Sequence, residues 1–311
     1  MRGRGSNPST YSIILWMGIG LLGGIGTGMG YLVSLTVPVK SFPQKKGLIT
    51  GVVVAGFGAG AILLTYLADF LFKNSVGVLH VFLYWGTLYG LIIILAAQQL
   101  KTSGLKASQI SYSSVTPMNG VVLFKLILGI FAGTFTGLLI IGNLKPIAQM
   151  QEVSMYAIPL AISLFALSNF TGRIVWGWMS DRIGNTLLIP TALLVQGAVS
   201  MSLFSVPVSD IQFISLIILI GFCFGAHFVL FAKDTIQMFG IDNYAKIYPF
   251  IFLGYGFAGI AGPFIGGWVV DLTGEYMYAI LLAFTLSIVA TFIYVFIDKK
   301  VHVTNRAFQI R

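Results

Sequence analysis

The part of the sequence best suited to chemistry is an arginine inside an apolar segment, followed by a short charged motif. Arg173 carries a planar guanidinium group, which can hold a carboxylate through two parallel hydrogen bonds. The motif reads Gly-x-x-Ser-Asp-Arg-x-Gly and consists of Gly177, Ser180, Asp181, Arg182 and Gly184. We expect it to form a short turn between two tightly packed antiparallel helices.

Other ionisable residues inside apolar segments are few. His227 lies one helical turn from Phe224 and could carry a proton, so we include it in the candidate site; a histidine that is hydrogen-bonded for packing is the commoner alternative. Lys125 comes early in its segment, which indicates an anchor at the membrane interface. We find no catalytic triad, carboxylate pair or metal-ligand spacing in the sequence, and predict neither an enzyme nor a cofactor or metal site.

The composition is typical of an integral membrane protein. Hydrophobic residues make up 57% of the chain and charged residues only 9%, whereas soluble domains contain roughly 25% charged residues. The formal net charge is +9, but the basic residues lie in short connections between apolar segments, which argues against nucleic acid as a partner. Cys223 is the single cysteine and lies in an apolar segment, which excludes a disulfide framework and indicates a packing role.

About nine apolar segments are long enough to cross a bilayer, which needs roughly 20 residues. We therefore predict an all-α, multi-pass protein of the plasma or inner membrane, embedded in the lipid bilayer as a monomer. The segments are 11–38, 47–72, 76–98, 120–142, 152–176, 186–207, 211–232, 246–270 and 276–297.

The charges of the connections predict the orientation. Basic residues are concentrated in alternate connections and in the C-terminal tail, which places that side in the cytoplasm. An odd number of spans then places the N-terminus outside, although Arg2 and Arg4 favour the cytoplasmic side.

An internal repeat accounts for this conflict. Glycines and aromatic residues at positions 24–58 recur in the second part at a displacement of roughly 197 residues, as expected for parallel duplicated halves. Three further segments precede the second copy, and none precedes the first. We therefore expect helices 4 to 12 of a twelve-helix ancestor, with a partial first half at 1–98, a cytoplasmic linker at 99–119 and a six-helix half with a cytoplasmic tail at 120–311.

Glycines four residues apart predict faces where helix backbones approach closely. We expect such contacts at three places. The sets are Gly20, Gly24 and Gly28, then Gly129, Gly133 and Gly137, and finally Gly262 and Gly266.

Several stretches resemble the oxalate/formate antiporter family of the major facilitator superfamily. The charged motif is similar to the one that major facilitators carry between helices two and three and between helices eight and nine. Further similar stretches are 40–51, 55–60, 163–173 and 176–184. The resemblance covers about 11–298 and implies the major facilitator fold, in which an anion crosses between two helical halves by alternating access.

The resemblance also implies which residues surround the substrate. Arg173 falls on the family's substrate-binding arginine, and Tyr31 falls on an aromatic position of helix four. Phe224 and Phe252 fall on aromatic positions of helices ten and eleven. Tyr255 stands where the oxalate exchanger has a lysine, so the two-cation clamp for a dicarboxylate is incomplete and a monocarboxylate is favoured.

Two functional hypotheses follow. The first is a secondary active transporter of small organic anions, either a carboxylate exchanger or a proton-coupled monocarboxylate transporter. The second is a truncated, transport-inactive paralogue with a structural or interaction role, because without the first three helices half of the substrate cavity lacks a wall. None of the nine acidic residues lies in the middle of a predicted span, which makes a substrate carboxylate the expected partner of Arg173. The alternative is that Arg173 snorkels to the interface or pairs with Asp181.

For the charged motif we predict a gating role, carried by Gly177, Asp181, Arg182 and Gly184. We expect the carboxylate of Asp181 to cap the following helix or to pair with a neighbouring basic group. Either contact would hold a cytoplasmic gate in one of its two states.

Overall fold

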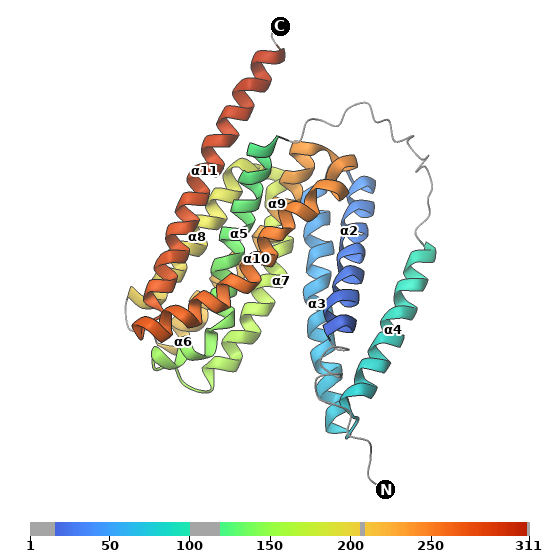
Figure 1. Ribbon diagram of the computed structural model, residues 1–311, viewed down its shortest axis with the longest axis vertical. Helices are drawn as coiled ribbons and strands as arrows, with labels where there is room; N and C mark the ends of the chain where they lie inside the picture. The colour runs from blue at the N-terminus through green and yellow to red at the C-terminus, as the bar shows by residue number, and fades with distance from the viewer. Residues whose placement is uncertain (1–15, 100–118, 206–208, 310–311) are drawn as a thin grey trace. The chain divides into compact units, whose positions relative to one another are not determined.

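The computed structural model describes residues 16–99, 119–205 and 209–309. Within these ranges the chain is helical and contains no strand (Figure 1). Eight of the described helices are long and apolar enough to cross a membrane, and α3 (Lys46–Lys73) is a further helix of 28 residues. The prediction of an all-α membrane protein with about nine spanning helices is confirmed.

The chain forms two compact units, which we describe separately. The larger unit contains Met1–Ala55 and Val121–Arg311, and the smaller contains Gly56–Gly120. In the smaller unit, the second part of α3 is followed by α4 (Val78–Gln99). The predicted linker falls almost entirely outside the described residues, so the division into duplicated halves stays a prediction.

The larger unit contains every helix that contributes to the candidate site. Before the linker these are the π-helix η1 (Trp16–Gly23), α2 (Gly24–Ser41) and the first part of α3. After it come α5 (Gly120–Gly142), α6 (Leu144–Met150), α7 (Ala157–Ile183), α8 (Asn185–Ser205), α9 (Asp210–Phe239), α10 (Ile241–Thr273) and α11 (Met277–Gln309). α9 is central, because it contacts α7, α8 and α10, while α11 packs on α8 (Figure 1).

Close helix packing brings α5 against α9. Gly129, Gly133 and Gly137 lie on the face of α5 that meets α9. A Cβ atom on any of them would collide with a ring from α9, which belongs to Phe231, His227 or Phe224 respectively. This set therefore lies at a tight helix contact, but rings of α9 and not a neighbouring backbone occupy the space beside the glycines, which differs from the predicted backbone approach.

The other two glycine sets differ from each other. Gly262 and Gly266 of α10 also meet α5, with Leu139 and Asn143 as their nearest neighbours. Gly20, Gly24 and Gly28 form no tight contact with any described residue, because their missing side chains point into open space or toward an indole ring at van der Waals distance. The predicted contact is thus correct for α10 and wrong for the described surroundings of η1 and α2.

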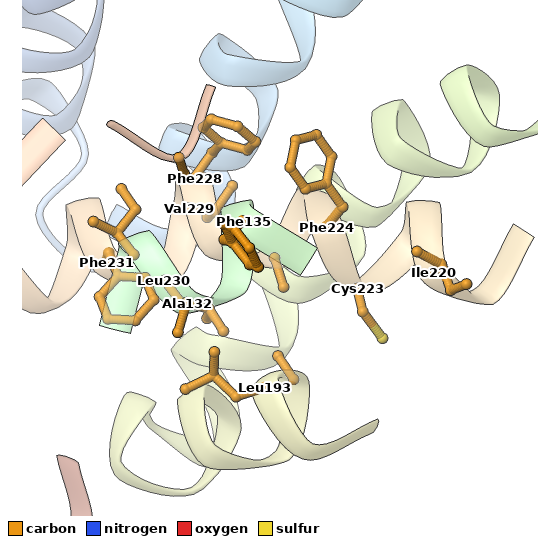
Figure 2. Packing of buried hydrophobic residues seen from close by; sticks show 14 of the residues in the cluster. Ala132, Phe135, Leu193, Ile220, Cys223, Phe224, Phe228, Val229, Leu230 and Phe231 are labelled. Carbon is orange, nitrogen blue, oxygen red and sulfur yellow. The ribbon is translucent and has the colours of Figure 1, made fainter. Parts of the chain in front are cut away.

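Apolar side chains fill the space between α9, α5 and α8. Figure 2 shows Phe231 of α9, Phe135 of α5 and Leu193 of α8 among these side chains, whereas Phe224 and Phe228 point to the opposite side of α9 from Leu193. Cys223 belongs to the same buried cluster and is a free thiol. Its predicted packing role is confirmed.

The charged motif is helical, which corrects the prediction of a turn that opens at Gly177. α7 continues through Asp181 and Arg182 to Ile183. The turn is the single residue Gly184, whose φ of 92° favours glycine. Gly177 serves close packing instead, because its Cβ would collide with the backbone of Gly47 in α3.

α9 is also longer than predicted, since it ends at Phe239 and not near residue 232. Lys233 and Asp234 are consequently buried inside a helix and do not lie in a cytoplasmic connection. Both are neutralised by ion pairs across helices, to Asp181 and Lys125 respectively. Hydropathy alone underestimates the length of a helix when its charged residues form ion pairs inside the bundle.

Candidate functional site

Four helices place the candidate residues at one depth. Arg173 lies ten residues before the end of α7, and Phe228 lies eleven before the end of α9. Tyr31 lies ten residues before the end of α2, and Phe252 lies eleven after the start of α10. At 1.5 Å per residue each is about 15 Å from its helix end, which is half of the roughly 30 Å hydrocarbon core.

Arg173 therefore lies deeper than the sequence predicted. The apolar segment was expected to stop at residue 176, which placed the arginine near the interface. Because α7 continues to Ile183, its guanidinium is about three helical turns from the helix end. Snorkelling to the interface is not the conformation observed, since the side chain is only 8% exposed and contacts α3.

The contacts of Arg173 are to neutral groups. Its Nη1 donates to the carbonyl oxygen of Val54 at 2.5 Å, and its Nε donates to Oδ1 of Asn169 at 3.2 Å. The guanidinium lies over the ring of Phe228, 4.8 Å from its centroid. α3 comes this close because Gly51 packs on the backbone of Arg173. Among the described residues, no carboxylate pairs with this arginine.

The four predicted aromatic residues form one group with Phe228, the ring that contacts the arginine. Tyr31 stacks on Phe252 with centroids 5.2 Å apart, and Phe252 lies 5.0 Å from Tyr255. Phe228 connects the two sides of the group, because its ring lies 5.0 Å from Tyr255 and 5.1 Å from Phe224. We call Tyr31, Phe224, Phe228, Phe252 and Tyr255 the aromatic wall.

Two further aromatic residues of this group were not predicted from the sequence. Phe228 follows Phe224 by one helical turn, and Tyr248 precedes Phe252 by one turn, so helical spacing could have indicated both. Tyr248 also stacks against Tyr31, with centroids 6.4 Å apart. Tyr31, Tyr248 and Tyr255 are all near enough to the guanidinium of Arg173 to interact with it electrostatically.

The structure does not place His227 at the aromatic wall. Its ring lies against Gly133 of α5, and its Nε2 is 2.5 Å from Oε1 of Gln196 in α8. The amide nitrogen of Gln196 donates in turn to the carbonyl of Gly133. The imidazole thus belongs to a buried polar contact among three helices, which corresponds to the packing alternative considered above.

Asp181 joins α7 to α3 and α9. Its two carboxylate oxygens accept hydrogen bonds from the backbone N–H groups of Gly47 and Leu48, each at 2.8 Å. It also pairs with Lys233 at 2.8 Å. The expected pairing with a basic group is present, whereas the helix that it caps is α3 and not the following α8. The N-terminus of α3 attracts this carboxylate because its N–H groups have no partners within the helix.

The remaining residues of the motif have separate contacts. The guanidinium of Arg182 lies over the ring of Trp178, 4.0 Å from the centroid. A second ion pair on the same predicted side joins Lys40 at the end of α2 to Asp242 in the first turn of α10, at 2.8 Å. On the predicted cytoplasmic side, the helices before the linker are therefore joined to those after it by two contacts. One is between Asp181 and the N-terminus of α3, and the other is between Lys40 and Asp242.

A buried ion pair corrects the interpretation of Lys125 as an interfacial anchor. Lys125 is 1% exposed, and its Nζ lies 3.6 Å from Oδ2 of Asp234. Tyr294 of α11 donates to the same carboxylate oxygen at 2.8 Å, and Lys125 lies over its ring. Asp234 also shows that one acidic residue lies well inside a helix, which the predicted span boundaries had excluded.

Comparison with known proteins identifies the family. The model described as Major Facilitator Superfamily matches residues 6–240 and 126–309. The chain belongs to the major facilitator superfamily. As a member of this superfamily it is an integral membrane protein, and its relatives are transporters.

Three relatives illustrate this membership. The chain is 28% identical to the uncharacterized MFS-type transporter YhjX of Escherichia coli, over 80% of this chain and 63% of the relative. It is 26% identical to the oxalate:formate antiporter of Oxalobacter formigenes, over 88% and 68%. It is 24% identical to monocarboxylate transporter 13 of Rattus norvegicus, over 86% and 64%. The match thus spans about two thirds of the length of these facilitators, and the predicted resemblance to the oxalate/formate antiporter family is confirmed.

Proposed function

We propose that this facilitator is a secondary active transporter of small organic anions and that Arg173 binds the substrate carboxylate. The observation that carries this proposal is the position of the arginine, about 15 Å from the helix end, in contact only with neutral partners among the described residues. Major facilitators hold their substrates near the middle of the bilayer, between helical halves.

Charge balance supports the assignment. The other buried cations among the described residues have carboxylates beside them, since Lys125 lies next to Asp234 and Lys233 pairs with Asp181. An unneutralised cation at the bilayer centre costs about 2.5–3.5 kcal/mol on insertion scales. A substrate carboxylate at Arg173 offsets this cost through a charge-assisted, bidentate hydrogen bond.

The aromatic wall supports a small, singly charged substrate. It offers the hydroxyls of Tyr31 and Tyr255 as hydrogen-bond donors, and no second cation contacts the wall among the described residues. The names of the relatives, an oxalate:formate antiporter and a monocarboxylate transporter, agree with a carboxylate. We infer that a monocarboxylate such as formate binds more tightly than a dianion such as oxalate.

Alternating access supplies the mechanism. Asp181 and Lys40 join early and late helices on the predicted cytoplasmic side. We infer that these contacts form when the site faces the outside and break when it opens to the cytoplasm. Neutralising the charge of Arg173 by substrate lowers the cost of moving the site between the two states.

Binding and transport by Arg173 variants test the proposal. Equilibrium dialysis with radiolabelled formate should show a 10- to 100-fold weaker affinity, on the order of one lost charged hydrogen bond, in Arg173→Gln. Arg173→Lys should weaken binding as well, because lysine cannot form the planar bidentate pair. Lys145→Gln removes an exposed cation and serves as the control. Unchanged formate affinity in Arg173→Gln would contradict the assignment.

A further inference from the structure

Two buried tyrosines continue the aromatic wall along α10. Tyr248 lies one turn before Phe252, and Tyr244 lies one turn before Tyr248. Ring centroids are 5.4 Å apart for Tyr248 and Phe252 and 4.8 Å apart for Tyr244 and Tyr248, and the second pair is stacked. Both tyrosines have no exposed surface.

The row of rings runs from the site toward the predicted cytoplasmic end of α10. Tyr244 lies three residues after the start of the helix and Tyr248 lies seven after it, which corresponds to depths of about 5 and 10 Å. Tyr31 of α2 reaches the row from the other side and stacks on both Tyr248 and Phe252. The row therefore connects Arg173 with the helix end.

The row differs from ordinary packing because it contains phenol hydroxyls. A buried phenol hydroxyl needs a hydrogen-bond partner, whereas a phenylalanine ring in the same place does not. Tyr31, Tyr244 and Tyr248 lie near enough for their hydroxyl groups to interact electrostatically with one another. Three O–H donors thus lie in one row, between Arg173 and the ion pair of Lys40 with Asp242 in the first turn of α10.

We propose that the hydroxyls of Tyr31, Tyr248 and Tyr244 form the path by which a carboxylate moves between Arg173 and the cytoplasm. This inference rests on the proposed function, because it needs a carboxylate at Arg173. When the gate opens, each hydroxyl donates in turn to the anion, which avoids the cost of a bare carboxylate in an apolar passage. Stacking of the same rings closes the passage in the structure described here.

Neutral donors suit a path better than a second cation. Conduction requires binding that is strong enough for entry and weak enough for release. A lysine at Tyr248 would hold the anion, whereas a phenol supplies a hydrogen bond without net charge. The two tyrosines should therefore affect the rate of transport more than the affinity of the site.

Removal of single hydroxyls tests this path. Tyr248→Phe and Tyr244→Phe keep the ring and its packing, and Tyr278→Phe removes the hydroxyl of a tyrosine that is 54% exposed. We would measure formate–formate exchange in proteoliposomes and formate affinity by equilibrium dialysis. Each path variant should slow exchange about 2- to 10-fold, the equivalent of one net hydrogen bond. Affinity should change less than two-fold, and the control should match the unmodified protein.

The possible results are distinguishable. Unchanged exchange in both Tyr248→Phe and Tyr244→Phe would overturn the path, because only the hydroxyls differ. An equal loss in affinity and in rate would assign these tyrosines to the substrate site and also overturn it. Absence of Arg173-dependent formate binding in the unmodified protein would remove the proposed function, and the path with it.

Discussion

At the scale of single residues, charge pairing distinguishes the charged residues with a structural role from Arg173, the candidate substrate-binding residue. Lys125 and Asp234 lie beside each other inside the bundle, and Asp181 satisfies Lys233 together with two backbone N–H groups. Arg173 contacts only neutral oxygens and an aromatic ring among the described residues. This difference supports the proposal that a substrate carboxylate binds Arg173.

Tyr255→Lys should change the preference for substrate charge. The side chain lies 5.0 Å from both Phe252 and Phe228, ring to ring, so a lysine there would reach the aromatic wall beside Arg173. A second cation pairs with a second carboxylate, and we expect oxalate to gain at least about 10-fold over formate, the value of one charged hydrogen bond. Competition of both anions against labelled formate measures this ratio. An unchanged ratio would exclude Tyr255 from the site.

Asp234→Asn should destabilise the protein without affecting substrate binding. The substitution removes the carboxylate that lies beside Lys125 and accepts from Tyr294. Loss of one partner of a buried ion pair costs about 3–5 kcal/mol, whereas an apolar replacement of both is often neutral. We expect a lower melting temperature in detergent for Asp234→Asn and a substantial recovery in Lys125→Met/Asp234→Leu. A single variant as stable as the parent protein would contradict this role.

At the scale of helices, the position of a helix end determines whether a charged residue lies inside the bundle or in a connection. The length of the apolar segments predicted the helices well, but their ends were placed too early in α7 and α9. The breaks fall at Gly184 and Gly240, which have φ of 92° and 78°. An apolar segment ends at its first charged residues, but a helix can continue through them. Asp181, Lys233 and Asp234 lie inside helices because each has a partner on another helix, and the local sequence does not indicate those partners.

Asp181→Asn should alter the rate of transport more than the affinity. The amide still has one oxygen for the N–H groups of α3, but it loses the ion pair with Lys233. A contact present in only one of two states shifts their equilibrium when it is weakened. We expect exchange to change several-fold and formate affinity to stay within about two-fold, because the site at Arg173 is untouched. A change confined to affinity would remove the gating role.

At the scale of the whole molecule, the family and the number of helices were predictable from the sequence, whereas side-chain neighbours were predictable only in part. Hydropathy and the motif residues indicated a major facilitator, and the family match agrees. Arg173, Tyr31, Phe224, Phe252 and Tyr255 come together as predicted, whereas His227 turns toward α8. The side on which a helical residue faces depends on helix rotation, and the weak amphipathicity of buried membrane helices does not encode that rotation.

The predicted orientation can be tested with two exposed positions in a Cys223→Ala background. Asp242→Cys lies at the start of α10, and Glu275→Cys lies in the connection between α10 and α11. The positive connections place the first position in the cytoplasm and the second outside. A membrane-impermeant maleimide added to intact cells should therefore label only Glu275→Cys. The reverse pattern would invert the topology and the direction of the proposed path.

The single-residue joints at Gly184 and Gly240 have a mechanical consequence. Each is too short to take up a displacement of one helix relative to the next, so a tilt of α7 is passed directly to α8, and a tilt of α9 directly to α10. Arg173 lies on α7, Phe228 lies on α9, and Phe252 and the buried tyrosines lie on α10. A change of angle between α7 and α9 would therefore change the distance from the guanidinium to Phe228, whereas a rotation at Gly240 would change the distance from Phe228 to the rings of α10.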